Sequence, residues 1–243
     1  MRSLIRKGMG VAAILILLVC SAGIVSAEEA APEEVWEFGL ELYLWGASMG
    51  GKSAAGSEID LEFDDILDSL ELAFMGLAEV RRGKWSLATD VIYLNLEDSA
   101  PLAPGAEANL ELSGWIVTPF LGYNLVDTKR INLDILGGAR YLDLSAELRV
   151  DPLRVKESGS NWDAVVGVRG GVNLTERWYL PYHFDIGTGN SNVTWQAFGG
   201  IAYRFKYADL ALAYRYLRWN FDDNKTFDNL YFHGPFIGVK FRF

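Results

Sequence analysis

The chain has 243 residues, of which 50% are hydrophobic and 13% aromatic, and its formal net charge is −10 at pH 7. This acidic balance argues against nucleic acid as a partner, because phosphate binding needs a basic surface. The one cysteine, Cys20, falls within the segment from Met1 to Ala27, so the rest of the chain has no disulfide and no thiol chemistry.

The segment from Met1 to Ala27 has the pattern of an export signal. Three bases and no acids come first, an apolar run covers residues 11–20, and small residues end at Ala27. We therefore expect residues 1–27 to be a cleaved signal peptide and residues 28–35 to be a short acidic linker in the periplasm. The alternatives are a membrane anchor, for which the run falls short of roughly 20 residues, and a lipoprotein, for which Cys20 lacks a preceding small residue. Without the signal, 19 of the 22 bases remain against 32 acids, a net charge near −13.

After the linker, apolar and polar residues alternate as they do in half-buried β-strands. No run of 18 apolar residues occurs there, so we expect no spanning helix. Two folds fit such a chain: a soluble all-β periplasmic domain, and a closed barrel, which satisfies every backbone group inside lipid. Ten segments alternate in this way, and they are 36–48, 70–81, 85–97, 109–124, 131–149, 162–174, 178–187, 193–205, 209–220 and 229–243.

The connections between these segments alternate in length. Short ones are 82–84, 126–130, 175–177 and 206–208, and mostly longer ones are 49–69, 98–108, 150–161, 188–192 and 221–228. Short turns at one end and long loops at the other are typical of outer-membrane barrels. The sequence therefore predicts an all-β, closed antiparallel transmembrane β-barrel over residues 36–243, with ten strands and with eight or twelve as the alternatives.

The first long loop contains a stretch with helical spacing. Ile66, Leu67 and Leu70 lie three and four residues apart in an acidic segment that starts near Glu58. We expect either a short helix over the mouth or in the lumen, or a surface loop with one amphipathic turn. The acids of this loop match no calcium-binding spacing, so we predict no metal site there.

The distribution of charge indicates which face of each strand is inward. One face carries seven acids and seven bases, while the middle of the other face is apolar, aromatic, Gly or Ala. A lysine or arginine that faces lipid at the midplane costs about 2–4 kcal/mol, so we assign the charged face to the lumen. We expect these residues to form an ion-pair network that fills a narrow lumen, with a charged pore lining as the alternative. Besides Arg81 and Arg242, the members are Glu37, Glu41, Glu79, Asp90, Asp134, Arg140, Asp163, Arg169, Asp185, Arg204, Arg215 and Lys240.

Aromatic residues cluster near the predicted strand ends, where amphipathic rings suit a lipid–water interface. We place one group near the periplasmic rim: Trp36, Phe38, Trp85, Tyr123, Trp178, Phe241 and Phe243. We place a second group near the outer rim: Tyr93, Tyr216 and Tyr231.

The last strand alternates and ends in Phe241-Arg242-Phe243. Here the sequence resembles bacterial outer-membrane barrels, whose last strand typically ends in Phe, and the resemblance implies that Phe241 and Phe243 are a signal read by the barrel-assembly machinery. A further resemblance, over about residues 36–243, is to a family of small, largely uncharacterised proteobacterial outer-membrane proteins. It rests on GGARYLDL (137–144), WDAVVGVR (162–169), TWQAFGGIAYRF (194–205), ALAYRYL (211–217) and GPFIGVKFRF (234–243). This resemblance implies a location and a fold, and it supplies no catalytic residues.

Candidate catalytic groups are few. His183 and Asp185 share a strand face, which would suit a base and its orienting acid, but no nucleophile is specified. We therefore interpret His183 as a structural histidine of the lumen and His233 as an interfacial residue on the lipid side. We predict no enzymatic activity, no cofactor and no metal.

The predicted function is that of an integral protein in the outer membrane of a Gram-negative bacterium, with a structural or surface role that extends at most to a narrow pore. Its expected partners are membrane lipid, lipopolysaccharide and the barrel-assembly machinery. The alternative is an outer-membrane enzyme or a ligand-binding barrel with a site at the lumen mouth. The sequence makes no prediction about the oligomeric state.

Overall fold

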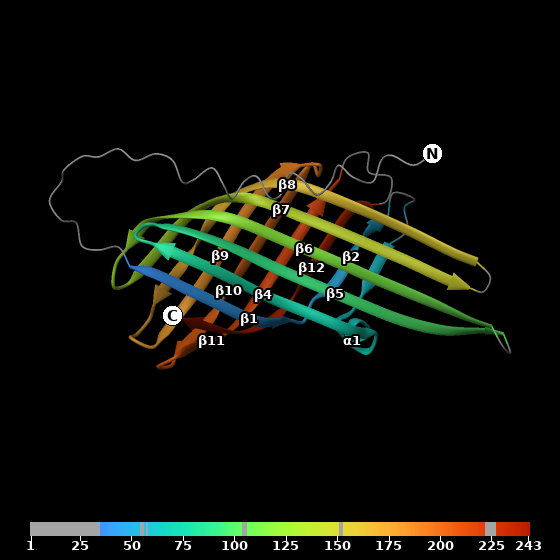
Figure 1. The fold of residues 1–243 in the computed structure, drawn as a ribbon, viewed down its shortest axis with the longest axis horizontal. Coiled ribbons are helices and arrows are strands. Elements are labelled where there is room, and N and C mark those ends of the chain that lie inside the picture. Colours follow the sequence, from blue (N-terminus) through green and yellow to red (C-terminus); the bar gives the residue numbers. More distant parts are fainter. Residues whose placement is uncertain (1–34, 54–55, 57, 104–105, 151–152, 222–226) are drawn as a thin grey trace. The chain divides into compact units, whose positions relative to one another are not determined.

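A computed structural model describes residues 35–243, apart from 54–55, 57, 104–105, 151–152 and 222–226 (Figure 1). The predicted signal peptide, and the predicted linker up to residue 34, lie outside the described residues. In the described part of the chain, no helix has the length and apolar character needed to cross a membrane.

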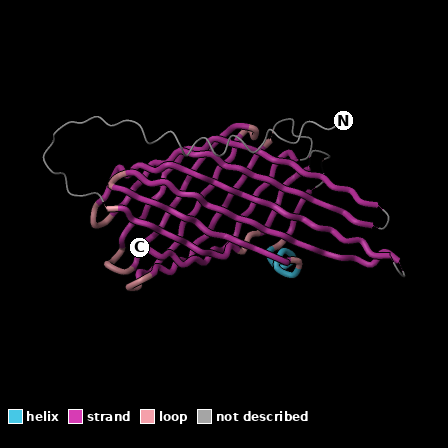
Figure 2. The backbone as a smooth tube through the Cα atoms, viewed as in Figure 1, coloured by secondary structure: helices cyan, strands magenta, loops and turns pink. Residues whose placement is uncertain are grey.

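Ten strands close an antiparallel β-barrel, and two further strands and one helix are inserted between the first and second of the ten (Figures 1 and 2). The ten are β1 (Trp36–Trp45), β4 (Leu70–Arg82), β5 (Trp85–Ala103), β6 (Ala106–Asp127), β7 (Ile131–Val150), β8 (Leu153–Asn173), β9 (Trp178–Gly189), β10 (Val193–Arg204), β11 (Ala208–Asn220) and β12 (Phe227–Arg242). The inserted elements are β2 (Ser48–Ser53), β3 (Glu58–Leu61) and α1 (Phe63–Asp68). Pairing of β12 with β1 closes the barrel, so the predicted ten-stranded antiparallel barrel is confirmed.

Alternation along each strand separates an outer and an inner face, as predicted. On β1, Leu42 and Leu44 are exposed on the outside, whereas Tyr43 and Trp45 are buried inside. Because successive side chains of a strand point to opposite faces, one period-2 pattern supplies both the apolar exterior and the contents of the lumen.

The predicted loops at 98–108 and 150–161 are wrong, because strands run through most of both. Strands β5 to β8 are 19 to 22 residues long, while β9, β10 and β11 have 12 or 13. Serine and glycine in 158–160 favour a loop locally. The ladder between β7 and β8 overrides that preference and pairs Ser158 with Ser145.

Of the two alternatives for the first long loop, the structure has the short helix, over Phe63–Asp68, and residues 58–61 form strand β3. Ile66 is buried and Leu67 is exposed. Leu70, which the helical spacing included, is the first residue of β4.

Paired aromatic rings mark two levels on the outside of the barrel. Near the short turns, the ring centroids of Trp85 and Tyr123 are 4.8 Å apart. Toward the other end the pairs are Tyr93–Trp115, Tyr141–Trp162 and Trp195–Tyr216, with centroids 4.4 to 4.8 Å apart. Between the two levels the exposed side chains are apolar, among them Leu87, Leu121, Ile135, Val166, Phe184, Ile201, Leu212 and Ile237. An apolar band between two aromatic girdles is the surface of a barrel that crosses a lipid bilayer.

Candidate functional site in the lumen

The inner face of the barrel changes character along its length. On β11, for example, inward positions pass from Asp209 through Arg215 to Trp219, and all three are buried. The lumen therefore has three layers: a charged cavity at the end with the short turns, a compact polar network in the middle, and an apolar layer beyond it.

The charged cavity has a volume of about 980 Å³. Its lining includes Gly83, Lys84, Asp127 and Thr128 from the short turns and Phe243 at the end of the chain, so it reaches that end of the barrel. Seven acids and seven Lys or Arg residues line it, which makes it neutral as a whole.

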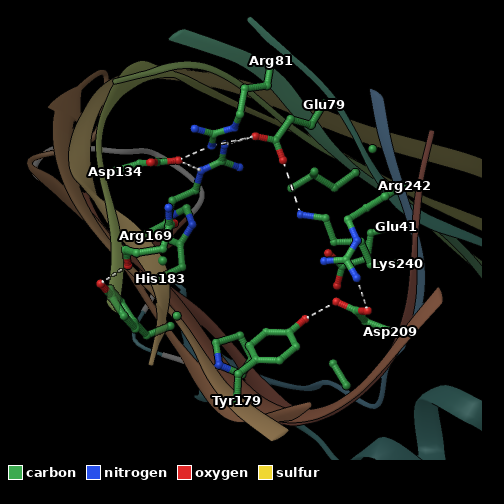
Figure 3. Close-up of a pocket in the computed structure, with 18 of the residues that line it drawn as sticks. Glu41, Glu79, Arg81, Asp134, Arg169, Tyr179, His183, Asp209, Lys240 and Arg242 are labelled. Carbon is green, nitrogen blue, oxygen red and sulfur yellow. Dashed lines mark hydrogen bonds and ion pairs between the residues drawn. The ribbon is translucent and has the colours of Figure 1, made fainter. Parts of the chain in front are cut away.

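One wall of the cavity is a cluster around two carboxylates, Glu79 and Asp134 (Figure 3). Glu79 accepts hydrogen bonds from Arg169, from Arg81 at 3.2 Å and from Lys240 at 3.4 Å. Asp134 is bonded to Arg81 and lies 3.5 Å from Nε of Arg169. These contacts join β4, β7, β8 and β12. Because these strands are not all neighbours in the sheet, the cluster connects them through side chains inside the lumen.

The opposite wall is built around Asp209 (Figure 3). Arg242 donates to Asp209 at 2.6 Å, and the Tyr179 hydroxyl donates to it at 2.8 Å. The guanidinium of Arg204 lies 4.4 Å from the ring centroid of Tyr179 and donates to the Asn173 side chain at 2.8 Å. This wall connects β8 to β12 near the short turns.

The middle layer contains two buried ion pairs joined by one amide. Arg140 donates to both oxygens of Asp185 at 2.7 Å, and Arg215 donates to Asp90 at 2.6 Å. Gln196 accepts from Arg215 at 2.5 Å and donates to Asp185 at 3.5 Å, so it connects the pairs. His183 Nε2 and the Tyr43 hydroxyl complete the layer, the first 2.7 Å from Asp185 and the second 2.5 Å from Asp90. Six strands contribute to this layer, which therefore crosses the lumen.

The apolar layer lies on the far side of the middle layer. Its buried members include Trp45, Met49, Ile66, Met75, Ile92, Ile116, Leu142, Leu217, Trp219, Leu230 and Phe232. Arg140 touches its boundary, with the guanidinium 6.0 Å from the ring centroid of Trp219. An ion that left the middle layer in this direction would meet hydrocarbon instead of water.

Eight of the twelve predicted network residues form ion pairs in the structure: Glu79, Asp90, Asp134, Arg140, Arg169, Asp185, Arg215 and Lys240. Arg204 instead bonds to the amide of Asn173, and Asp163 accepts from Asn161 at 2.5 Å and from the Ser191 N–H at 2.9 Å. Glu37 and Glu41 line the cavity, and among the described residues neither has a base within 4.0 Å.

Several contributors were not assigned to the network from sequence, among them Asp209, Tyr43, Tyr179 and Gln196. Asp209 was detectable, because it lies six positions before Arg215 on the same strand, and an even offset puts both side chains on one face. The two tyrosines and the glutamine carry no formal charge, so a search for charges on one face passes over them.

Both histidines have partners in the structure. His183 bonds to Asp185, and its ring lies edge-on to Phe120 with centroids 6.0 Å apart. His233 lies on the outside of β12, where its Nδ1 is 2.7 Å from the Tyr214 hydroxyl. In the described part of the chain, no three His, Cys, Asp or Glu side chains come together as a metal site.

No family model matches the sequence, and no curated protein matches it. Among solved structures, the outer membrane protease OmpT from Escherichia coli is similar with a TM-score of 0.55 and 11% identity, over 85% of this chain and 97% of that one. The translocator domain of the autotransporter NalP from Neisseria meningitidis gives 0.47 and 14%, over 88% and 90%. Ail, the attachment invasion locus protein of Yersinia pestis, gives 0.42 and 9%, over 87% and 100%. Because so few residues are identical, the likeness to OmpT concerns the fold alone, and that fold is the closed β-barrel of outer-membrane proteins.

Proposed function

We propose that this chain is an integral outer-membrane protein of a Gram-negative bacterium, with a structural or surface role and with a lumen that does not conduct ions in this conformation. The apolar band between two aromatic girdles supports insertion into a membrane. The export pattern that ends at Ala27 supports the outer membrane as the destination. Membrane lipid, lipopolysaccharide and the barrel-assembly machinery are the partners that this role implies.

The observation that carries the proposal is that two closed layers, the polar middle layer and the apolar layer, follow one another along the lumen. An ion entering from the charged cavity meets Arg140, Asp185 and Arg215, which are buried and already paired with each other or with Asp90. Beyond them lies the apolar layer, which an ion can cross only without its water shell. Barrels of about this size are usually filled by side chains, whereas wide aqueous channels need more strands.

The charged cavity favours a second candidate function, the binding of a polar molecule from the end with the short turns. Its volume of about 980 Å³ is at the upper end of the range typical of small-molecule sites, roughly 300–1,000 Å³. Catalysis has less support, because in the described part of the chain His183 contacts Asp185 and the ring of Phe120 rather than a nucleophile.

Recording from planar bilayers tests the non-conducting lumen. We expect the wild-type protein to insert, as judged by a heat-dependent shift on gels, and to give no discrete conductance steps. The variant R215A/W219A removes one large side chain from each closed layer and should conduct. Its matched control is R149A/W162A, which removes one arginine and one tryptophan outside the lumen and should stay silent. Steps in the wild type would overturn the non-conducting lumen, and the lack of any heat-dependent shift would count against the inserted barrel itself.

A further inference from the structure

The wall of the barrel contains a seam between β1 and β4. Their pairing runs from Trp36↔Arg82 to Leu42↔Gly76 and stops there. On its other edge β1 pairs with β12 from Gly39↔Arg242 to Trp45↔Phe236, and the chain then continues into β2, whose partners are β12 and β3. Among the described residues, no strand pairing joins the segment Leu70–Met75 of β4 to β1, β2 or β3.

At the start of the seam, a side-chain sulfur takes the place of the backbone carbonyl that would accept a hydrogen bond in a continuous β-ladder. The backbone N–H of Trp45 donates to the sulfur of Met75 at 3.3 Å. A thioether is a weak acceptor, and backbone groups left without strong partners are costly inside a bilayer. The wall is therefore held more weakly here than along β11 and β12, which pair without a break from Ala208↔Phe241 to Asn220↔Asn229.

Helix α1 packs beside this seam. The ring of Phe63 lies so close to Gly46 that a β-carbon there would come within 3.2 Å of it. Ile66 reaches the apolar layer and is buried, whereas Leu67 on the same helix is exposed. Figure 2 shows this single turn of helix at the end of β4. Because α1 has only six residues, its position depends mainly on these side chains.

Both sides of the seam are apolar. Outside, Leu44 and Phe74 are exposed, and Phe74 lies opposite Tyr93 of the aromatic girdle, where the wall meets the edge of the lipid. Inside, Trp45, Met49 and Met75 belong to the apolar layer. A hydrocarbon chain could pass between the two without desolvating any charged group, and methionine side chains adapt readily to a new neighbour. A polar solute would find no partners on this path.

We propose that the seam is a lateral portal, through which an acyl chain of a membrane lipid enters the apolar layer when Phe63 and Ile66 give way. The proposal rests on the membrane location in the proposed function. It assigns α1 the role of the side wall of the portal. The network around Arg215 and Asp90 forms its floor, since it separates the apolar layer from the charged cavity.

Photolabelling from lipid tests the portal. The full barrel is reconstituted into phosphatidylcholine vesicles that contain a phospholipid with a diazirine at the end of one acyl chain, irradiated, and mapped by mass spectrometry. We expect adducts at outward Leu44 and Phe74 and also at inward Trp45 and Met75. Inward Leu217 and Leu230, in the same apolar layer beside fully paired wall, should carry far fewer adducts.

Variants of α1 sharpen the test. F63A/I66A should raise the ratio of inward to outward adducts near the seam, and the control L67A, which changes an exposed residue of the same helix, should leave it unchanged. Adducts at outward residues alone, in both the wild type and F63A/I66A, would overturn the portal and leave the proposed function standing. Equal labelling of all inward residues, unaffected by F63A/I66A, would place lipid entry elsewhere and also overturn it. A lack of outward adducts would remove the membrane location, and the portal with it.

Discussion

Nη2 of Arg140 lies 2.7 Å from both carboxylate oxygens of Asp185, and the side chains are 0% and 1% exposed. The pair joins β7 to β9 and passes over β8, which lies between them in the sheet. Register places Asp163, not Asp185, directly opposite Arg140 on the neighbouring strand. The long arginine side chain thus reaches past β8, and the pair braces two strands that share no backbone ladder.

Breaking this pair should be costly. Replacing Arg140 with Met leaves Asp185 buried without its guanidinium, and we expect R140M to lose about 3–5 kcal/mol of unfolding free energy. The double variant R140M/D185L removes both charges and should recover much of that loss. Reversible urea unfolding in lipid vesicles measures the difference.

The control for this prediction is Arg149, which pairs with Glu111 at 2.9 Å on the exposed part of β7. R149M should lower the unfolding free energy far less than R140M does, because exposed ion pairs are screened by solvent. Equal losses in R140M and R149M would contradict the bracing role of the buried pair.

Glu147 offers a test of pH dependence outside the membrane-spanning segments, because it lies on β7 six residues beyond Tyr141, which belongs to the aromatic girdle away from the short turns. The hydrogen bond from Arg149 Nε, at 2.6 Å, lowers the pKa of the Glu147 carboxyl below its ordinary value. A carboxyl whose folded pKa is lowered adds stability above its unfolded pKa and loses it as the pH falls through the folded pKa. Nuclear magnetic resonance titration should therefore place Glu147 below the ordinary range, and R149M should move it back up.

Lys156 provides the comparison for that titration. Its Nζ lies 3.9 Å from Glu147, farther than the Arg149 contact, so K156M should shift the pKa of Glu147 less than R149M does. A wild-type Glu147 that titrates at its ordinary pKa would rule out the hydrogen bond from Arg149.

Phe243 allows the proposed assembly signal to be separated from barrel closure. Its backbone N–H donates to the Phe38 carbonyl at 2.9 Å and its carbonyl accepts from the Phe38 N–H at 3.1 Å, while the ring is exposed. F243A keeps the backbone pair and removes the ring. If the ring is part of a signal, F243A should lower the heat-modifiable fraction in outer membranes nearly as far as deletion of the residue does. F205A, which removes another exposed ring near the short turns, should leave the heat-modifiable fraction unchanged. A heat-modifiable fraction of F243A equal to that of the wild type would refute the role of the ring.

Period-2 alternation was sufficient to predict the number of strands and most of their inward residues, because burial of one face and exposure of the other is imposed residue by residue. It missed the full length of β5 to β8. It could not predict which inward residues meet. Arg140 faces Asp163 in register and yet bonds to Asp185, while Asp163 is already occupied by Asn161 and the backbone of Ser191. Which carboxylate an arginine binds depends on how far its side chain extends into the lumen. The width of the lumen is set by all the strands together and cannot be inferred from one of them.

The seam was also beyond sequence reasoning. The stretch that contains Ile59, Phe63 and Ile66 has too few residues for a decisive period, and the pairing of β3 with β2 instead of β4 is a tertiary choice. The residues of α1 were predictable as a helical turn, but their place beside a gap in the ladder follows only from where the pairing of β1 with β4 ends.

The long strands β5 to β8 have a consequence for access to the mouth opposite the short turns. At about 3.3 Å per residue, the 21 residues of β8 extend roughly 70 Å along the strand, against roughly 40 Å for the 12 residues of β9. The rim is therefore bevelled rather than level. A large molecule that moves along the membrane surface would be screened on the β5–β8 side and would meet the mouth from the low side, over β9 to β11, so the direction of approach is built into the unequal height of the wall.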